Sequence, residues 1–241
     1  MAPLLRRLRL HRSLLLLALL VAAHAGEALP TTCFANLHAG KAQTVVLYGT
    51  SLTHGGEWAV ATKTWFSEHY AGKATVLNSA GPGQNSQWGL ANLDERVLAH
   101  QPDLVLIEFS YNDAHEKFKL TVEQAASNLD AMVRGIRAKR PTCDIVLQVM
   151  NANWDAPNEK PAMSSRPQLT AFNDNYRAYA KAHGLPLIDH FPAWQALKEK
   201  DADLFHRYVP DGTHPNKDGS LAITWPGVKA LLERADRATA R

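Results

Sequence analysis

The sequence predicts an α/β fold in which an open, parallel β-sheet is covered by helices on both faces. The chain has 241 residues, 46% of them hydrophobic, which is enough for one full-sized core and fits a single domain. Five short runs are almost continuously apolar, as is typical of parallel strands buried on both faces. Stretches with helical periodicity separate these runs, and such alternation with right-handed crossovers predicts one parallel sheet.

The first predicted strand is "TVVLYG", residues 44–49, and a predicted helix over 57–71 follows it. The other strands are predicted over 74–80, 103–110, 144–150 and 185–190. Between them we expect helices over 86–100, 121–139 and 168–183, and a closing helix from about residue 218. The longest irregular stretch, "NANWDAPNEKPAMSSRP" at 151–167, is long enough to be a functional loop beside a site.

The first 25 residues have the pattern of an export signal. A basic stretch, "MAPLLRRLRLHR", precedes the apolar run "SLLLLALLVA", and small residues in "AHA" at 23–25 suit a signal peptidase. An uncleaved membrane anchor is the alternative, but the apolar run is shorter than the ~20 residues that span a bilayer. We therefore expect a periplasmic or extracellular protein with a signal peptide at 1–25, an N-terminal segment at 26–43 and one domain at 44–241.

The charge of the chain argues against two classes of partner. The predicted signal peptide holds four of the 26 basic residues and no acidic residue, which leaves 22 basic against 23 acidic residues in the mature chain. Without a basic patch, nothing indicates nucleic acid or an anionic membrane surface as a partner. We expect no stable membrane insertion after signal cleavage, and the sequence leaves the oligomeric state open.

Cys33 and Cys143 are the only cysteines. In an oxidising compartment they could pair and tie the N-terminal segment to the domain, and two unpaired buried thiols are equally compatible with the sequence. No metal site is predicted, because neither the cysteines nor the isolated His54 and His115 show the spacing of metal ligands.

Four polar segments follow strands or precede the last helix. In a parallel α/β sheet the ligand site lies beyond the carboxyl ends of the strands, so these segments are the candidates for chemistry. Ser51 follows the first strand, "NSAGPGQNS" follows the second, "YND" follows the third, and "DGTHPN" precedes the closing helix.

Ser51, His214 and Asp211 have the side chains that nucleophilic acyl transfer needs. A serine hydroxyl becomes a good nucleophile when a base takes its proton, and the base must be held in one tautomer by an acceptor on its other nitrogen. Asp211 lies three residues before His214, close enough to accept a hydrogen bond from Nδ1 and leave Nε2 facing Ser51. The sequence therefore predicts a Ser51–His214–Asp211 triad.

Three donors are predicted for the oxyanion of the tetrahedral intermediate. They are the backbone N–H of Ser51, the backbone N–H of Gly83 in a glycine-rich turn, and the side-chain amide of Asn112. Each segment alone is more typical of a turn or a helix cap, but all four occur in the order and at the strand ends that one mechanism requires.

These segments together resemble the blocks of the SGNH (GDSL-type) serine hydrolases. "GTSLT" is similar to the first block, with Thr50 where the family has aspartate, and "NSAGPGQNSQWGL" is similar to the second. "SYND" resembles the third block, with Tyr111 where many members have glycine, and "DGTHPN" resembles the fifth. The resemblance covers about residues 44–225 and assigns the roles above to Ser51, Gly83, Asn112, Asp211 and His214.

The resemblance implies a flavodoxin-like three-layer α/β/α sandwich with a five-stranded parallel sheet of order 2-1-3-4-5. It also implies a serine carboxylic-ester hydrolase that works through an acyl-enzyme and without a cofactor. It does not fix the substrate, because members act on lipid esters, thioesters, aryl esters and acetylated sugars.

Other residues give hints about the substrate. Tyr111 and Trp154 lie near the site-forming segments and could line an acyl slot or stack on a sugar face, although core packing is the more frequent role of such aromatics. Without a long apolar lid, we expect a short acyl group, such as acetyl, on a carbohydrate or another small polar alcohol. An acyltransferase, a lysophospholipase or a thioesterase using the same site is the alternative.

Overall fold

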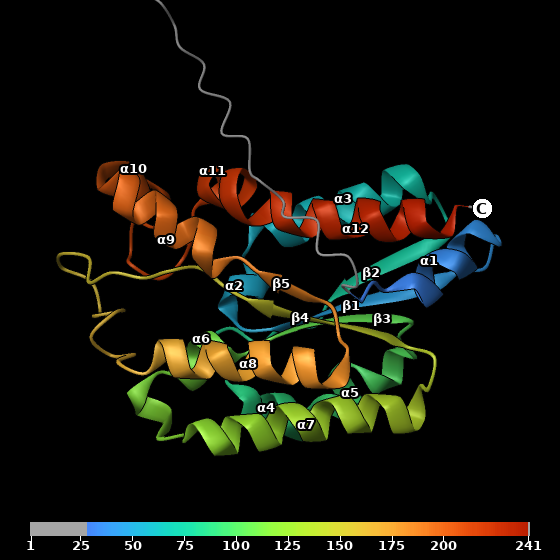
Figure 1. Cartoon of the computed structure of the whole chain (residues 1–241), viewed down its shortest axis with the longest axis horizontal. Coiled ribbons are helices and arrows are strands. Elements are labelled where there is room, and N and C mark those ends of the chain that lie inside the picture. Colours follow the sequence, from blue (N-terminus) through green and yellow to red (C-terminus); the bar gives the residue numbers. More distant parts are fainter. Residues whose placement is uncertain (1–27, 241) are drawn as a thin grey trace, which may run out of the picture.

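The computed structural model describes residues 28–240. The predicted signal peptide, residues 1–25, lies outside the described residues. At the centre is one sheet of five parallel strands in the order β2-β1-β3-β4-β5 (Figure 1). The strands are β1 Gln43–Gly49, β2 Ala74–Asn78, β3 Leu104–Glu108, β4 Asp144–Val149 and β5 Leu187–Asp189. The predicted parallel sheet, its five strands and their order are confirmed.

Helices cover both faces of the sheet, which gives three layers (Figure 1). Alternate side chains of a strand point to opposite faces, so Val45 and Leu47 join one core cluster while Val46 and Tyr48 join the other. The first cluster lies under α1 Thr31–His38, α3 Glu57–His69 and α12 Trp225–Thr239. The second lies under α5 Leu93–Arg96, α7 Val122–Lys139 and α8 Leu169–His183.

A third, smaller cluster supports the end of the molecule that carries residues 209–214. It joins Trp194 and Phe205, both fully buried, to Val209 and Ala152. Trp194 comes from α9 Phe191–Lys200 and Phe205 from α10 Ala202–Tyr208, two helices that were not predicted from the sequence. The shorter helical segments are α2 Ser51–His54, α4 Ser86–Ala91, η1 Leu98–His100, α6 Ser110–Asp113, η2 Glu116–Phe118, α11 Lys217–Gly219 and η3 Ser220–Thr224.

One predicted helix is divided for a local reason. The helix expected over 86–100 is interrupted at Asn92, where the backbone has φ −109° and ψ 12° and where the side-chain amide and the backbone N–H both donate to the oxygen of Trp88, over 2.8 and 3.0 Å. The predicted start of the closing helix near residue 218 is confirmed, because α11, η3 and α12 follow one another without a break from Lys217 to Thr239. Within it Ser220–Thr224 forms a wider π-helical turn, which lies just before Pro226, a residue without the N–H that an α-helix would use.

The N-terminal segment is built into the domain. Cys33, Phe34 and Leu37 of α1 are buried in the first core cluster, and the backbone N–H of Cys33 donates to the Asp144 carboxylate at the start of β4 over 2.8 Å. Both cysteines are free thiols, and burial raises the pKa of Cys143 to about 12. Within residues 28–240, none of the helices has the length and apolar character of a membrane span.

Phe34 provides a test of how strongly α1 contributes to stability. Its ring is fully buried and lies 5.8–6.1 Å from the ring centroids of Trp65, Phe66 and Tyr70. We expect Phe34→Ala to lower the free energy of unfolding by about 3–5 kcal/mol in urea titrations, because it opens a cavity in this cluster. Thr31→Ala, at an exposed position of the same helix, is the control. Equal unfolding free energies for the two variants would contradict the packing of Phe34 in the first core cluster.

Candidate active site

One cavity of about 390 Å³ lies beyond the carboxyl ends of the strands and brings together all five residues predicted for the triad and the oxyanion hole. Ser51, Gly83 and Asn112 come from the segments after β1, β2 and β3, whereas Asp211 and His214 come from the turn after α10. Parallel strands end at the same edge of a sheet, which is why segments so distant in sequence meet here.

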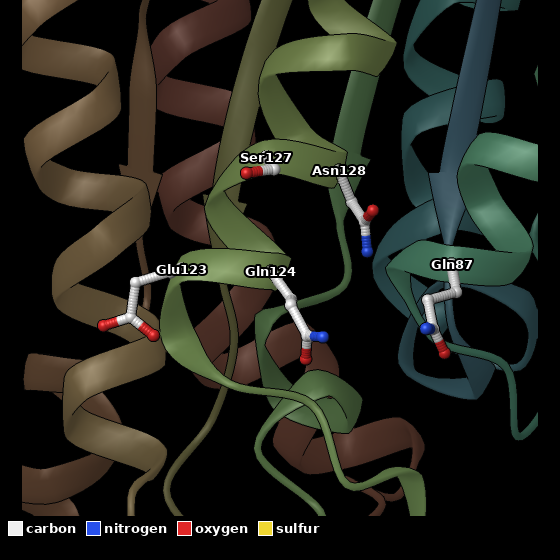
Figure 2. A pocket seen from close by; sticks show the side chains of 5 residues that line it. All are labelled: Gln87, Glu123, Gln124, Ser127 and Asn128. Carbon is white, nitrogen blue, oxygen red and sulfur yellow. The ribbon is translucent and has the colours of Figure 1, made fainter.

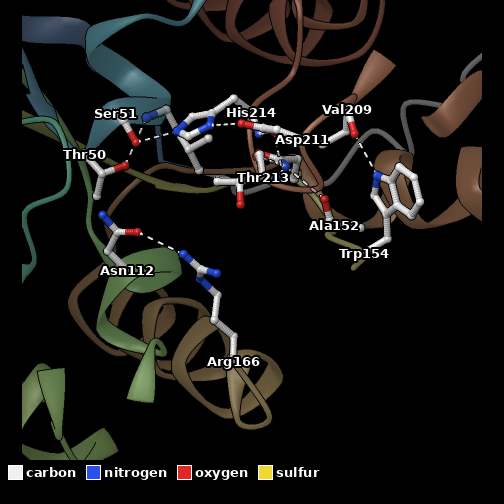
Figure 3. A network of polar contacts seen from close by, with 12 residues as sticks. Thr50, Ser51, Asn112, Ala152, Trp154, Arg166, Val209, Asp211, Thr213 and His214 are labelled. Carbon is white, nitrogen blue, oxygen red and sulfur yellow. Dashed lines mark hydrogen bonds and ion pairs between the residues drawn. The ribbon is translucent and has the colours of Figure 1, made fainter. Parts of the chain in front are cut away.

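Ser51 is the first residue of α2, and the turn before it fixes its position. Thr50 caps this helix in an extended conformation and accepts a hydrogen bond from the backbone N–H of Leu52. The Oγ atom of Ser51 lies 2.8 Å from Nε2 of His214 (Figure 3). The hydroxyl therefore lies within hydrogen-bond distance of a base.

His214 is held by Asp211 in one orientation. Nδ1 of His214 lies 2.6 Å from Oδ2 of Asp211, while Oδ1 of Asp211 accepts from the backbone N–H groups of Thr213 and His214. Partial burial raises the pKa of Asp211, but the hydrogen bonds from His214 and Thr213 outweigh it and hold this pKa below its usual value. An ionised carboxylate only accepts hydrogen bonds, so the proton lies on Nδ1 and Nε2 can accept from Ser51.

Trp154 and Gly212 hold the turn that carries Asp211 and His214. Gly212 has φ +78°, and a Cβ atom there would lie 2.1 Å from the backbone oxygen of Trp154, so only glycine fits. The backbone N–H of Trp154 donates to the oxygen of Gly212 over 3.2 Å, and its indole N–H donates to the oxygen of Val209 over 2.7 Å (Figure 3). The indole ring stacks on His206 with 3.7 Å between centroids.

The three predicted oxyanion donors border the cavity. Within the described part of the chain, the backbone N–H groups of Ser51 and Gly83 donate to no protein acceptor. The Nδ2 atom of Asn112 donates to the backbone oxygen of Gln84 over 2.7 Å, which uses one of its two hydrogens. In Figure 3 this nitrogen is on the side of the amide that faces Ser51.

Glu108, the last residue of β3, is a site residue that the sequence analysis missed. Its buried carboxylate accepts hydrogen bonds from the backbone N–H of Thr50 over 2.6 Å, the Thr50 hydroxyl over 2.9 Å and the Thr53 hydroxyl over 2.7 Å. It thus fixes the turn on both sides of Ser51. An aspartate at position 50 would place a second carboxylate against Glu108, whereas Thr50 supplies a donor.

Tyr111 and Trp154, the two residues predicted to line the substrate pocket, lie elsewhere. Tyr111 is only 1% exposed and packs beneath Arg166, and Trp154 holds the turn described above, so the structure places neither on the wall of the cavity. Their positions correspond to the core-packing alternative. The outer wall consists of polar and charged side chains with two small apolar residues, namely His115, Lys117, Glu159, Lys160, Pro161, Ala162 and Arg166.

A second hollow, of about 310 Å³, lies between α4 and α7 (Figure 2). Its wall contains amide, hydroxyl and carboxylate groups but no histidine that could activate Ser127, so it is not the candidate site. The residues are Gln87, Glu123, Gln124, Ser127 and Asn128. Among residues 28–240, no group of three or more histidine, cysteine, aspartate and glutamate side chains is placed to hold a metal ion.

Comparison with known proteins identifies relatives of this fold and site. Residues 47–222 match the GDSL-like lipase/acylhydrolase family. The "Thioesterase 1/protease 1/lysophospholipase L1" of Escherichia coli strain K12 is 28% identical over 188 residues, which cover 77% of this chain and 81% of that protein.

Solved structures of similar fold include a lipase/acylhydrolase from Enterococcus faecalis, with a TM-score of 0.62, 24% identity, and coverage of 81% of this chain and 96% of that one. An acetylxylan esterase from Geobacillus stearothermophilus has a TM-score of 0.66 and 16% identity, with coverage of 79% and 94%. At these identities the likeness shows the fold alone.

The buried carboxyl of Glu108 predicts a specific dependence of stability on pH. Burial raises its pKa to about 7, although hydrogen bonds from Thr53 and Thr50 lower it. The folded chain thus binds a proton that the unfolded chain releases near pH 4, so this contribution to stability is complete below about pH 4 and is lost as pH rises to about 7. Over this range Glu108 makes the unfolding free energy fall by up to about 1.4 kcal/mol per pH unit, and we expect Glu108→Gln to remove this contribution.

Urea titrations at several pH values between 4 and 8 measure this dependence. Asp94→Asn, at an exposed position, is the control and should keep the slope of the unmodified chain. Burial also raises the pKa of Asp113 to about 7. Because both variants keep Asp113, the part of the slope that it causes remains in both. A slope that Glu108→Gln leaves unchanged would contradict the raised pKa of Glu108.

Proposed function

The chain belongs to the GDSL-like lipase/acylhydrolase family, and from this premise we propose that it is a serine esterase that removes a short acyl group, such as acetyl, from a carbohydrate or a similar polar alcohol. The observation that carries the proposal is the chain of contacts from Ser51 Oγ to His214 Nε2 and from His214 Nδ1 to Asp211, 2.8 and 2.6 Å long, at the edge of an open cavity. The relatives named above are esterases and acylhydrolases.

The proposed reaction proceeds through an acyl-enzyme. His214 takes the hydroxyl proton of Ser51 as Oγ attacks the ester carbonyl, and Asp211 stabilises the resulting imidazolium. The backbone N–H groups of Ser51 and Gly83 and the amide of Asn112 donate to the oxyanion. His214 then protonates the leaving alcohol. A water molecule, deprotonated by His214, attacks the acyl group, and the carboxylic acid leaves as Ser51 regains its proton.

The wall of the cavity supports a short acyl group and a polar alcohol as the leaving group. Lys117, Glu159, Lys160 and Arg166 border the space in front of Ser51, and a long alkyl chain there would lie against charged groups and exclude water from them. A sugar can instead donate to and accept from such side chains. The acetylxylan esterase of similar fold is an example of this chemistry on the same architecture.

The second candidate is hydrolysis of thioesters or lysophospholipids, and the relative from Escherichia coli, at 28% identity, favours it. Acyl transfer is a variant of the first proposal, in which a sugar hydroxyl and not water accepts the acyl group. We also propose export, because residues 1–25 combine a basic stretch, an apolar run and a small-residue cleavage site.

A panel of p-nitrophenyl esters from acetate to palmitate, with acetylated xylan, an acyl-CoA and a lysophospholipid beside it, distinguishes these substrate classes. We expect kcat/KM to fall at least about tenfold from acetate to octanoate, because a longer chain meets the charged wall, and we expect acetate release from the polysaccharide. Faster turnover of the long esters or of the lysophospholipid would replace the first candidate with the second. Addition of a sugar acceptor, followed by product analysis, detects acyl transfer.

Replacement of the triad residues tests the mechanism on p-nitrophenyl acetate. We expect Ser51→Ala to lower kcat by about 10⁴-fold or more and His214→Ala to be nearly as damaging, since these residues act as a unit. Asp211→Asn should cost less than either. Ser127→Ala, an exposed serine of the second hollow, is the control (Figure 2). Unchanged turnover in Ser51→Ala, or labelling of another residue by a serine-directed phosphonate, would disprove the assignment.

A further inference from the structure

Arg166 is a buried cation on the wall of the active-site cavity. Its side chain is on the β4–α8 loop, residues 150–168, and the residue is only 7% exposed. Among residues 28–240 it forms no ion pair with a carboxylate. A buried guanidinium without a counter-ion is costly, so its neighbours should indicate what it does.

The contacts of Arg166 join the loop to the turn that carries Asn112. Nε donates to the backbone oxygen of Tyr111 over 3.0 Å, and the guanidinium lies 4.4 Å from the centroid of the Tyr111 ring. On the other side, Nη1 donates to the backbone oxygen of Ala162 over 2.9 Å and to the hydroxyl of Ser165 over 3.2 Å. Neutral acceptors thus hold the planar group in one orientation.

The remaining nitrogen of the guanidinium faces the side chain of Asn112. Nη2 lies 3.5 Å from Oδ1 of Asn112, and Figure 3 shows the amide oxygen turned toward Arg166 and the amide nitrogen turned away from it. An arginine can donate but not accept. A flip of the amide would place N–H groups against the cation and turn an oxygen toward the position of the oxyanion.

We propose that Arg166 is a positioning residue for the oxyanion hole, which holds the Asn112 amide with Nδ2 on the side of Ser51. The hydrogen bond from Nδ2 to Gln84 favours the same orientation from the opposite end of the amide. The inference rests on the proposed function, because it assumes that Asn112 donates to an oxyanion. It also connects the loop that forms the outer wall to the atoms that carry out the chemistry.

A double-mutant cycle on p-nitrophenyl acetate, a neutral substrate, tests this role. We expect Asn112→Ala alone to lower kcat by roughly 100- to 1,000-fold with KM nearly unchanged, as for other oxyanion-hole side chains. Arg166→Met, which keeps the length of the stem and removes the donors, should lower kcat at least about tenfold with KM within about twofold. In the Asn112→Ala background the same change should lower kcat less than about threefold, because the amide that Arg166 positions is already absent.

The cycle has a matched control and a defined alternative. Arg177→Met removes a partly buried arginine that pairs with Asp174 and Asp189 away from the cavity, and it should leave kcat unchanged in both backgrounds. An equal loss from Arg166→Met in both backgrounds would overturn the positioning role. A higher KM with unchanged kcat would also overturn it, and would indicate that Arg166 contacts the substrate directly.

Two further measurements distinguish failure of the Arg166 role from misfolding of a variant and from failure of the proposed function. The stoichiometry of phosphonate labelling counts the intact sites in each preparation, and kcat is expressed per labelled site. If Arg166→Met does not fold, Arg166→Lys, which keeps the charge but not the fork of donors, takes its place in the cycle under the same criterion. If Ser51→Ala retains turnover, the proposed function fails. If Ser51 is essential and the cycle is additive, only the role of Arg166 fails.

Discussion

The contact between Nε2 of His214 and Oγ of Ser51, 2.8 Å long, joins two parts of the chain that are 163 residues apart, and most of the surrounding structure fixes one part or the other. On the side of Ser51, the position is set by β1, by the cap at Thr50 and by the three hydrogen bonds that Glu108 accepts. On the side of His214, the third core cluster and Trp154 hold the 209–214 turn. A displacement of about 1 Å on either side would lose this contact.

The buried titratable and charged side chains behind the site lower the stability of the fold. Glu108 and Asp113 are buried carboxyls whose pKa values burial raises to about 7, and Arg166 is a buried cation that none of the described carboxylates pairs with. A core of apolar residues would be more stable, so such groups are expected where a site must hold backbone and side-chain donors in fixed directions. Glu108 orients the turn at Ser51, and Asp113 accepts from the backbone N–H of Ser86 in the segment after Gly83.

The strands and the residues of the proposed triad could be predicted from the sequence because their signals are local. Continuous apolar runs mark strands that are buried on both faces, and Asp211 and His214 lie within one short segment. Arg166, Glu108 and the role of Trp154 could not be predicted, because each depends on a partner more than 50 residues away. The division of the helix at Asn92 depends on the backbone conformation of one residue, and hydrophobic periodicity does not detect such a local departure from the helix.

The arrangement separates the proposed chemistry from substrate choice. The proposed catalytic groups follow β1, β2 and β3 or lie on the turn before α11, and these elements are anchored in the main core clusters or the third cluster. The outer wall consists mainly of the β4–α8 loop, which has no regular structure of its own and tolerates substitution more easily than a core element. If Arg166 positions Asn112, this separation is incomplete. A change in the loop that moves Arg166 would then alter turnover as well as affinity, so the residues near Lys160 are better suited than those near Arg166 to alter specificity alone.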